Sequence, residues 1–121
     1  MARILIIDDT SEITQIYSAV LTSKGHGVVV ASSELQAWSA LEDGNYDYVL
    51  LDILMPDYSG LDLLQRSKLR QRCPDTRIII LSNSESDDFA QKAKQLGADR
   101  YLIKVENDPY RIAELIEKKE L

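Results

Sequence analysis

Five short apolar runs, rich in β-branched residues and leucine, alternate with segments of helical periodicity along the chain of 121 residues. The runs occupy residues 4–7, 28–31, 48–51, 78–81 and 101–103. Each run is continuous rather than alternating in polarity, which is typical of strands covered on both faces of a parallel sheet. We therefore expect five parallel strands.

The segments between these runs, and the one after the last, place apolar side chains at helical spacing. The expected stripes are Ile13, Ile16, Tyr17, Val20 and Leu21; Leu35, Trp38 and Leu41; Leu61, Leu64 and Leu69; Phe89, Ala93 and Leu96; and Ile112, Leu115 and Ile116. Expected helix starts are Thr10 or Ser11, Ser32 or Ser33, and Asn107 or Asp108 before Pro109; expected stops are Gly25, Gly44, Gly97 and a point before Pro74. The chain thus repeats a strand-helix unit five times.

Strands that alternate with helices predict a parallel sheet with helices on both faces and right-handed crossovers. Five units are too few to close an eight-stranded barrel, so we expect an open, doubly wound α/β sheet. Residues 1–121 contain no repeat or linker and are expected to form a single domain. In this architecture, functional groups lie outside the carboxyl ends of the strands.

The composition excludes several classes of function. A net charge of −6 argues against nucleic acid as a direct partner. No apolar run approaches the roughly 18 residues of a membrane span, and the start has no signal-peptide profile, so we expect a cytoplasmic chain without a membrane partner. The single cysteine, Cys73, is expected to be a bystander, and the single histidine, His26, a loop residue.

Polar side chains follow four of the five predicted strands. Asp8 and Asp9 end the first strand, Asp52 the third, Ser82 the fourth and Lys104 the fifth. An isolated acid at a strand end is most often a helix cap, as Asp8 or Asp9 alone would be. Polar groups at four ends of one sheet instead predict a site.

Three carboxylates at one edge oppose each other's ionisation unless a cation lies between them. Oxygen ligands suit Mg²⁺, so Mg²⁺ is the expected cofactor. Lys104 is expected either to pair with Asp52 in the resting state or, with Ser82, to hold a phosphoryl oxygen. Asp52 would then attack phosphorus as the nucleophile.

At these residues the chain resembles the receiver domain of bacterial response regulators in two-component systems, the CheY-like superfamily. The motifs that carry the resemblance are Ile6-Ile7-Asp8-Asp9, Leu51-Asp52-Ile53-Leu54-Met55-Pro56-Asp57-Tyr58-Ser59-Gly60, Ile80-Leu81-Ser82 and Tyr101-Leu102-Ile103-Lys104. The resemblance covers essentially the whole chain. It implies a flavodoxin-like (βα)5 sandwich with strand order 2-1-3-4-5.

The resemblance also implies how the site accepts phosphate. Asp52 is expected to be the phospho-acceptor, supplied by a histidine kinase, a phosphotransfer protein or small phosphodonors. Asp8, Asp9, Asp52 and the backbone carbonyl of Leu54 are expected to hold Mg²⁺. Such a domain is a signalling phospho-acceptor that catalyses only its own phosphotransfer and slow self-dephosphorylation.

Three further roles follow from the resemblance. Ser82 is expected to be the switch hydroxyl, Tyr101 the aromatic residue whose rotamer reports phosphorylation, and Lys104 the phosphate-binding lysine. A downstream protein is expected to bind the face formed by the fourth helix, fifth strand and fifth helix, near Phe89, Tyr101 and Ile112.

Four positions bear on how well the pattern holds. Val105 replaces the usual proline, typically preceded by a cis peptide, so the shape of the 104–107 loop is open. Asn83 replaces a small residue, and its bulk is expected to narrow access to Asp52 or restrict Tyr101. Leu54 and Ser84 occupy the two positions that influence hydrolysis of the phospho-aspartate, and an apolar Leu54 predicts slow self-dephosphorylation.

The sequence also bears on functions other than that of a phosphorylatable receiver. A phosphorylation-independent pseudo-receiver is the main alternative, motivated by Asn83 and Val105. An aspartate-nucleophile phosphatase would need a second aspartate where Leu54 stands. A flavin-binding protein would need a phosphate-binding loop where Asp8 and Asp9 stand.

Overall fold

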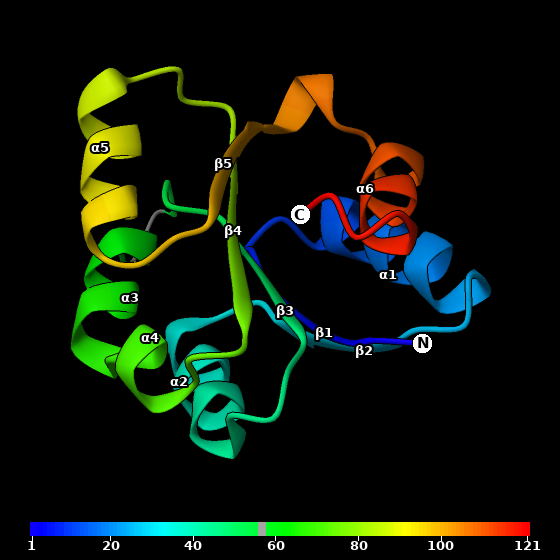
Figure 1. Ribbon diagram of the computed structural model, residues 1–121, viewed down its shortest axis with the longest axis horizontal. Helices are drawn as coiled ribbons and strands as arrows, with labels where there is room; N and C mark the ends of the chain where they lie inside the picture. The colour runs from blue at the N-terminus through cyan, green and yellow to red at the C-terminus, as the bar shows by residue number, and fades with distance from the viewer. Residues whose placement is uncertain (56–57) are drawn as a thin grey trace.

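The computed structural model describes residues 1–55 and 58–121 and confirms the five-stranded parallel sheet (Figure 1). The strand order is β2-β1-β3-β4-β5, as the resemblance implied. The strands are β1 (Arg3–Ile7), β2 (Gly27–Ala31), β3 (Tyr48–Leu51), β4 (Arg77–Ser82) and β5 (Arg100–Ile103). The order reverses between β1 and β3, which makes this the topological switch point.

Helices cover both faces of the sheet (Figure 1). They are α1 (Ser11–Ser23), α2 (Glu34–Asp43), α3 (Gly60–Ser67), α4 (Leu69–Arg72), α5 (Asp87–Gln95) and α6 (Pro109–Glu117), with a short 3-10 helix η1 at Lys104–Glu106. The predicted fourth and fifth helices are therefore α5 and α6. Helices α1 and α6 lie together on one face, and α2, α3 and α5 lie on the other (Figure 1).

Each face of the sheet has its own hydrophobic core. Leu5, Ile7, Val49, Leu51 and Ile78 point toward the α2, α3 and α5 side. Ile4, Ile6, Leu50, Ile79 and Leu81 point toward α1 and α6. Successive residues of one strand alternate between the two cores, so both faces are covered and the apolar runs are continuous.

Local signals place several helix ends where the sequence predicts them. Ser33 accepts a hydrogen bond from the backbone of Gln36, and Asp108 accepts one from the backbone of Arg111. Pro109 is the first residue of α6. Gly44 ends α2 with a φ of 65°. A left-handed residue carries little steric cost when it is glycine, which explains this stop.

Three sequence predictions about the helices are wrong. The third helix does not continue to Leu69, because Lys68 adopts a φ of 53° and separates α3 from α4. Ile16 is 56% exposed, since the buried stripe of α1 is centred near Tyr17 and each residue turns the helix by about 100°. Leu35 is 82% exposed because α2 buries Ala37 and Leu41 instead.

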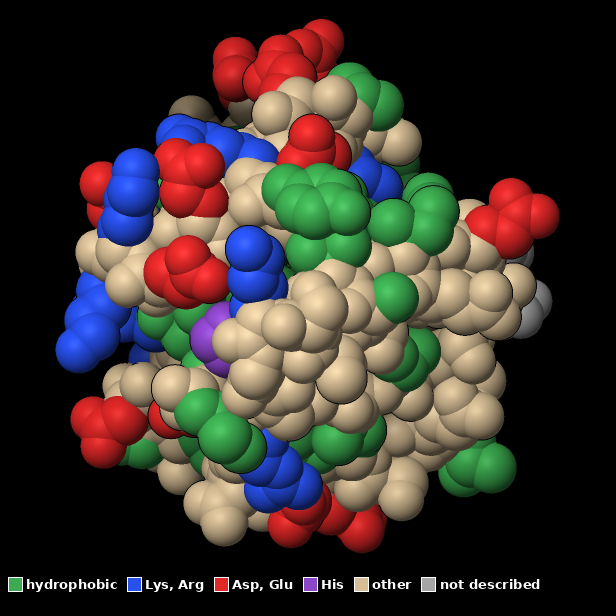
Figure 2. Space-filling model, turned by 90° about the vertical axis from the view of Figure 1, so that its right-hand side faces the viewer, with side chains coloured by type: hydrophobic (Ala, Val, Ile, Leu, Met, Phe, Trp, Pro, Cys, Tyr) green, Lys and Arg blue, Asp and Glu red, His purple; other side chains and the backbone are tan. Residues whose placement is uncertain are grey.

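The surface carries both signs of charge. On the face that Figure 2 shows, acidic and basic side chains are interspersed with apolar groups. Among the described residues, no helix has the length and apolar character needed to cross a membrane.

Candidate functional site

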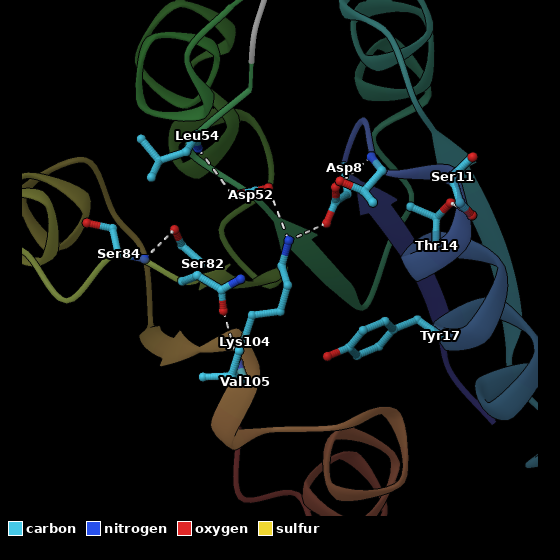
Figure 3. Close-up of polar contacts among 12 residues, drawn as sticks. Asp8, Ser11, Thr14, Tyr17, Asp52, Leu54, Ser82, Ser84, Lys104 and Val105 are labelled. Atoms are coloured by element: carbon cyan, nitrogen blue, oxygen red, sulfur yellow. Dashed lines mark hydrogen bonds and ion pairs between the residues drawn. The ribbon is translucent and has the colours of Figure 1, made fainter.

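The carboxyl ends of β1, β3, β4 and β5 bring the predicted polar residues to one edge of the sheet (Figure 3). The backbone N–H of Asp52 donates to the carbonyl of Ile7 at 2.9 Å, and that of Asp8 donates to Ala31 at 3.2 Å. These bonds extend the parallel ladders by one residue. Asp8 and Asp52 are thereby held beside each other at the switch point.

Lys104 bridges the two buried aspartates. Its Nζ lies 2.7 Å from Oδ2 of Asp8 and 3.1 Å from Oδ2 of Asp52. The three side chains are less than 10% exposed. The expected Lys104–Asp52 pair is therefore present, and Asp8 is a second partner. Buried charges are stable only when opposite charges compensate them. The Lys104 ammonium group provides this compensation for both carboxylates.

Asp8, Asp9 and Asp52 form a cluster that can hold a metal ion. One carboxylate oxygen from each lies within 4.8 Å of the others. Oδ1 of Asp8 accepts the backbone N–H of Thr10 at 2.9 Å, and Oδ1 of Asp52 accepts the backbone N–H of Leu54 at 3.1 Å. The donor set consists of oxygen atoms with an excess of negative charge, which fits a hard divalent cation.

Burial and neighbouring charges shift the acid-base equilibria of the pair. Burial raises the pKa of Asp52, although the charge of Lys104 and the N–H of Leu54 act in the opposite direction. Burial lowers the pKa of Lys104, but its hydrogen bonds and charge interactions with Asp8 and Asp52 outweigh this, so the net shift is upward. Lys104 is therefore firmly cationic.

Ser82 lies at the end of β4 and is fully buried. Its Oγ accepts a hydrogen bond from the backbone N–H of Ser84 at 3.2 Å. The hydroxyl of half-buried Tyr101 donates to the carbonyl of the same Ser84 at 2.7 Å. Ser84 therefore connects Ser82 and Tyr101, a link that the sequence analysis missed because it depends on the path of the β4–α5 loop.

The loop after Lys104 forms η1, and every described peptide bond is trans. Val105 is 80% exposed, and its backbone N–H donates to Oδ1 of Asn83 at 3.1 Å. The exposed Asn83 side chain thus contacts the Lys104 loop. The two departures from the receiver pattern touch each other.

Two tyrosines near the site were not predicted to contribute to it. The buried Tyr17 hydroxyl donates to the carbonyl of Asn107 at 2.7 Å, and burial raises its pKa to about 12. Among residues 1–55 and 58–121, the buried hydroxyl of Tyr58 finds no hydrogen-bond partner, and burial together with the nearby Asp9 carboxylate raises its pKa to about 12. No sequence signal distinguished Tyr17 from the other residues of its apolar stripe.

Gly60 packs directly against the backbone of Asp52, the residue that follows β3. A Cβ atom at this position would lie 2.1 Å from the backbone oxygen of Asp52. The glycine of the sequence motif is thus explained by a close backbone approach. Pro56 and Asp57 of the same motif lie outside the described residues.

The expected downstream face needs one correction. Ile112 is fully buried in the α1 and α6 core, because α6 turns this side chain toward the sheet. It is not part of a surface. Phe89 and Tyr101 are partly buried, and Tyr110 on α6 is 66% exposed.

Comparisons with known proteins agree with this geometry. The family model of the response regulator receiver domain matches residues 4–117. The chain is 36% identical over 115 residues to the DNA-binding transcriptional regulator NtrC of Azospirillum brasilense, covering 95% of this chain but only 23% of that protein. The chain thus spans about a quarter of that relative's length.

Solved structures show the same relationship. A CheY-like receiver domain protein from Methanospirillum hungatei superposes with a TM-score of 0.87 at 27% identity, covering 98% of this chain and 93% of that one. A response regulator from Burkholderia pseudomallei with a phosphorylated aspartic acid and a calcium ion has a TM-score of 0.79 at 25% identity, covering 99% and 73%. The chain therefore belongs to the response regulator receiver domain family, a family of signalling domains whose general function is phosphorylation-dependent switching.

Proposed function

We propose that residues 1–121 form a single cytoplasmic receiver domain in which Asp52 accepts a phosphoryl group. The donor would be a histidine kinase, a phosphotransfer protein or a small phosphodonor. The observation that carries this proposal is the position of Lys104 Nζ, within 3.1 Å of Asp52 and 2.7 Å of Asp8. A helix-capping role for the acids would not require a buried lysine between them.

The residues have distinct parts in this transfer. Asp8, Asp9, Asp52 and the Leu54 carbonyl would hold Mg²⁺, which when bound neutralises charge on the donor's phosphoryl group. A carboxylate oxygen of Asp52 forms a bond to phosphorus as the bond from phosphorus to the donor breaks, and the donor leaves with the electron pair. Lys104 then pairs with a phosphoryl oxygen.

The switch would use the β4–α5 loop. Ser82 releases the N–H of Ser84 and turns its hydroxyl to the phosphoryl group. Because Tyr101 is bonded to the carbonyl of Ser84, movement of this loop changes the surroundings of Tyr101. A downstream protein would read the change on the face of α5, β5 and α6.

Self-dephosphorylation is expected to be slow. The Leu54 side chain is 53% exposed beside the acceptor and cannot orient an attacking water molecule. Shortening this side chain with Leu54→Ala tests the shielding. If Leu54 keeps water away from the acceptor, the half-life of the phospho-protein should become shorter in this variant, and an unchanged half-life would contradict the shielding.

The decisive experiment is intact-mass spectrometry after incubation with acetyl phosphate and Mg²⁺. We expect one phosphoryl adduct on the wild-type protein. The adduct should disappear with EDTA and in Asp52→Asn, which keeps the size of the side chain but removes the nucleophilic carboxylate. A folded, Mg²⁺-binding protein that gains no adduct would contradict the proposal.

A phosphorylation-independent pseudo-receiver remains the second candidate, because Asn83 and Val105 give the Lys104 loop an unusual contact. In that case Asp52→Asn would leave partner binding unchanged. For a phosphorylatable receiver, the same variant should abolish the response of partner binding to acetyl phosphate.

A further inference from the structure

One hydrogen bond joins the loop that follows Ser82 to the loop that follows Lys104. The Val105 N–H donates to Asn83 Oδ1 at 3.1 Å (Figure 3). A proline at position 105 would have no N–H to donate, and a small apolar residue at position 83 would have no acceptor. The bond therefore depends on both of the residues that depart from the receiver pattern.

Both residues of this bond are sequence neighbours of residues in the site. Asn83 directly follows Ser82, which is fully buried at the end of β4. Val105 directly follows Lys104, whose Nζ reaches Asp8 and Asp52. The contact thus joins the side chain of the residue after Ser82 to the backbone of the residue after Lys104.

The far end of the Lys104 loop has separate anchors. Asn107 Nδ2 donates to the carbonyl of Ile103 at 2.9 Å, and the carbonyl of Asn107 accepts the Tyr17 hydroxyl at 2.7 Å. The near end has less support, because the Val105 side chain is 80% exposed and contributes little packing. The bond to Asn83 therefore stabilises the part of the loop closest to Lys104.

We propose that Asn83 is a positioning residue that holds the Lys104 loop against the Ser82 loop through the Val105 N–H. The inference rests on the proposed phosphorylation of Asp52. With the bond intact, Lys104 is held at Asp52 before the donor arrives. Without the bond, Lys104 has to be ordered during phosphoryl transfer. The rate of phosphorylation then falls by about three- to tenfold, which corresponds to the contribution of one hydrogen bond.

The test compares two substitutions of similar size at position 83. Asn83→Asp retains an oxygen acceptor, whereas Asn83→Leu does not. Phosphorylation by acetyl phosphate and Mg²⁺ is followed by intact-mass spectrometry, with Glu85→Ala as the control in the same exposed loop. We expect Asn83→Leu to be about three- to tenfold slower, and Asn83→Asp and Glu85→Ala to stay within about twofold of wild type.

Val105→Pro completes the comparison by removing the donor. If the bond is the cause, adding Asn83→Leu to Val105→Pro produces no further slowing. A slowing of equal size in both backgrounds would show that Asn83 acts by another route and would overturn the inference.

A second measurement needs neither metal nor phosphate. Amide hydrogen exchange at Val105, read by NMR, should be at least about threefold faster in Asn83→Leu than in wild type. If Asn83→Leu does not fold, Asn83→Ala is used for both measurements. Unchanged exchange, or a wild-type rate of phosphorylation in the folded variant, would overturn the inference; a wild-type protein that is never phosphorylated would instead overturn the proposed function.

Discussion

The amino ends of the strands form one edge of the sheet, here called the amino edge, and their carboxyl ends form the carboxyl edge. The two bury polar groups in different ways. At the amino edge, Thr76 Oγ1 donates to the carbonyl of Tyr46 at 2.7 Å, and His26 Nδ1 accepts the backbone N–H of Ala2 at 3.0 Å. At the carboxyl edge, Asp8, Asp52 and Lys104 face one another as ionisable side chains. Side chains that bond to backbone connect loops, whereas the charged side chains at the carboxyl edge compensate one another in a buried cluster.

The physical difference lies in desolvation. A buried hydroxyl or imidazole is neutral, so a backbone partner offsets much of its lost hydration, as at Thr76 Oγ1 and His26 Nδ1. A buried carboxylate needs a compensating charge, which makes its stability depend on Lys104 and on any bound cation. The carboxyl edge should therefore be the more sensitive to substitution, and the following experiments test that difference.

The largest expected effect follows removal of the central cation. Lys104→Met leaves Asp8 and Asp52 buried without their counter-charge, and we expect the free energy of unfolding in EDTA to fall by about 3 kcal/mol. Urea denaturation measures it. Lys118→Met, which removes an exposed lysine paired with Glu114, should cost less than about 0.5 kcal/mol. Similar losses in both variants would contradict the comparison.

Glycines at the two edges provide a matched pair. A Cβ at Gly60 would lie 2.1 Å from the backbone oxygen of Asp52, whereas a Cβ at Gly27 would have no atom within 4 Å. Gly60→Ala is therefore expected to destabilise the protein by about 2 kcal/mol, because the backbone has to shift. Gly27→Ala should stay within about 0.5 kcal/mol of wild type. Thermal and urea unfolding check both, and a Gly60→Ala protein as stable as Gly27→Ala would count against a tight junction at this edge.

Metal binding should stabilise the carboxyl edge selectively. At a Mg²⁺ concentration ten times its Kd, the wild-type protein should gain about 1.4 kcal/mol. Asp9→Asn should gain less than half of this at the same concentration, because one charged ligand is lost. In EDTA the variant should be at least as stable as wild type, since a like charge has been removed. Equal Mg²⁺ effects in the two proteins would exclude Asp9 from the metal site.

The smallest expected effect belongs to the amino edge. Burial lowers the pKa of His26, with the terminal ammonium group as a further cause. The unfolded chain therefore binds a proton at a higher pH than the folded protein does. As the pH falls from about 6.5 through the lower pKa of the folded state, this histidine lowers the free energy of unfolding. The melting temperature of His26→Gln should change less than that of wild type between pH 7.5 and 5. Parallel curves would contradict this role for His26.

Much of the architecture was predictable because it depends on local pattern. The five apolar runs became the five strands, and Ser33, Gly44, Asp108 and Pro109 marked helix ends as expected. These signals act within a few residues, through hydrogen bonds and allowed backbone angles. The break at Lys68 was not predictable, because a lysine with positive φ carries no local signal. Lys68 itself is exposed, whereas its neighbours Ser67 and Leu69 are both buried.

The candidate site was predictable in its members but not in its contacts. Parallel strands bring their carboxyl ends to one edge, so Asp8, Asp52 and Lys104 could be expected together. The structure adds that Lys104 contacts Asp8 as well as Asp52. The roles of the individual site residues stay predictions that the proposed phosphorylation experiments test.

By itself, the sequence determined the strand-helix alternation, the acidic net charge and the kinds of side chain that end each strand. These properties depend on residue type and spacing along the chain. Only the tertiary structure decided that Asn83 meets Val105 and that Ser84 connects Ser82 with Tyr101. Such contacts join residues on separate loops or elements, and the paths of those segments depend on the packing of the whole domain.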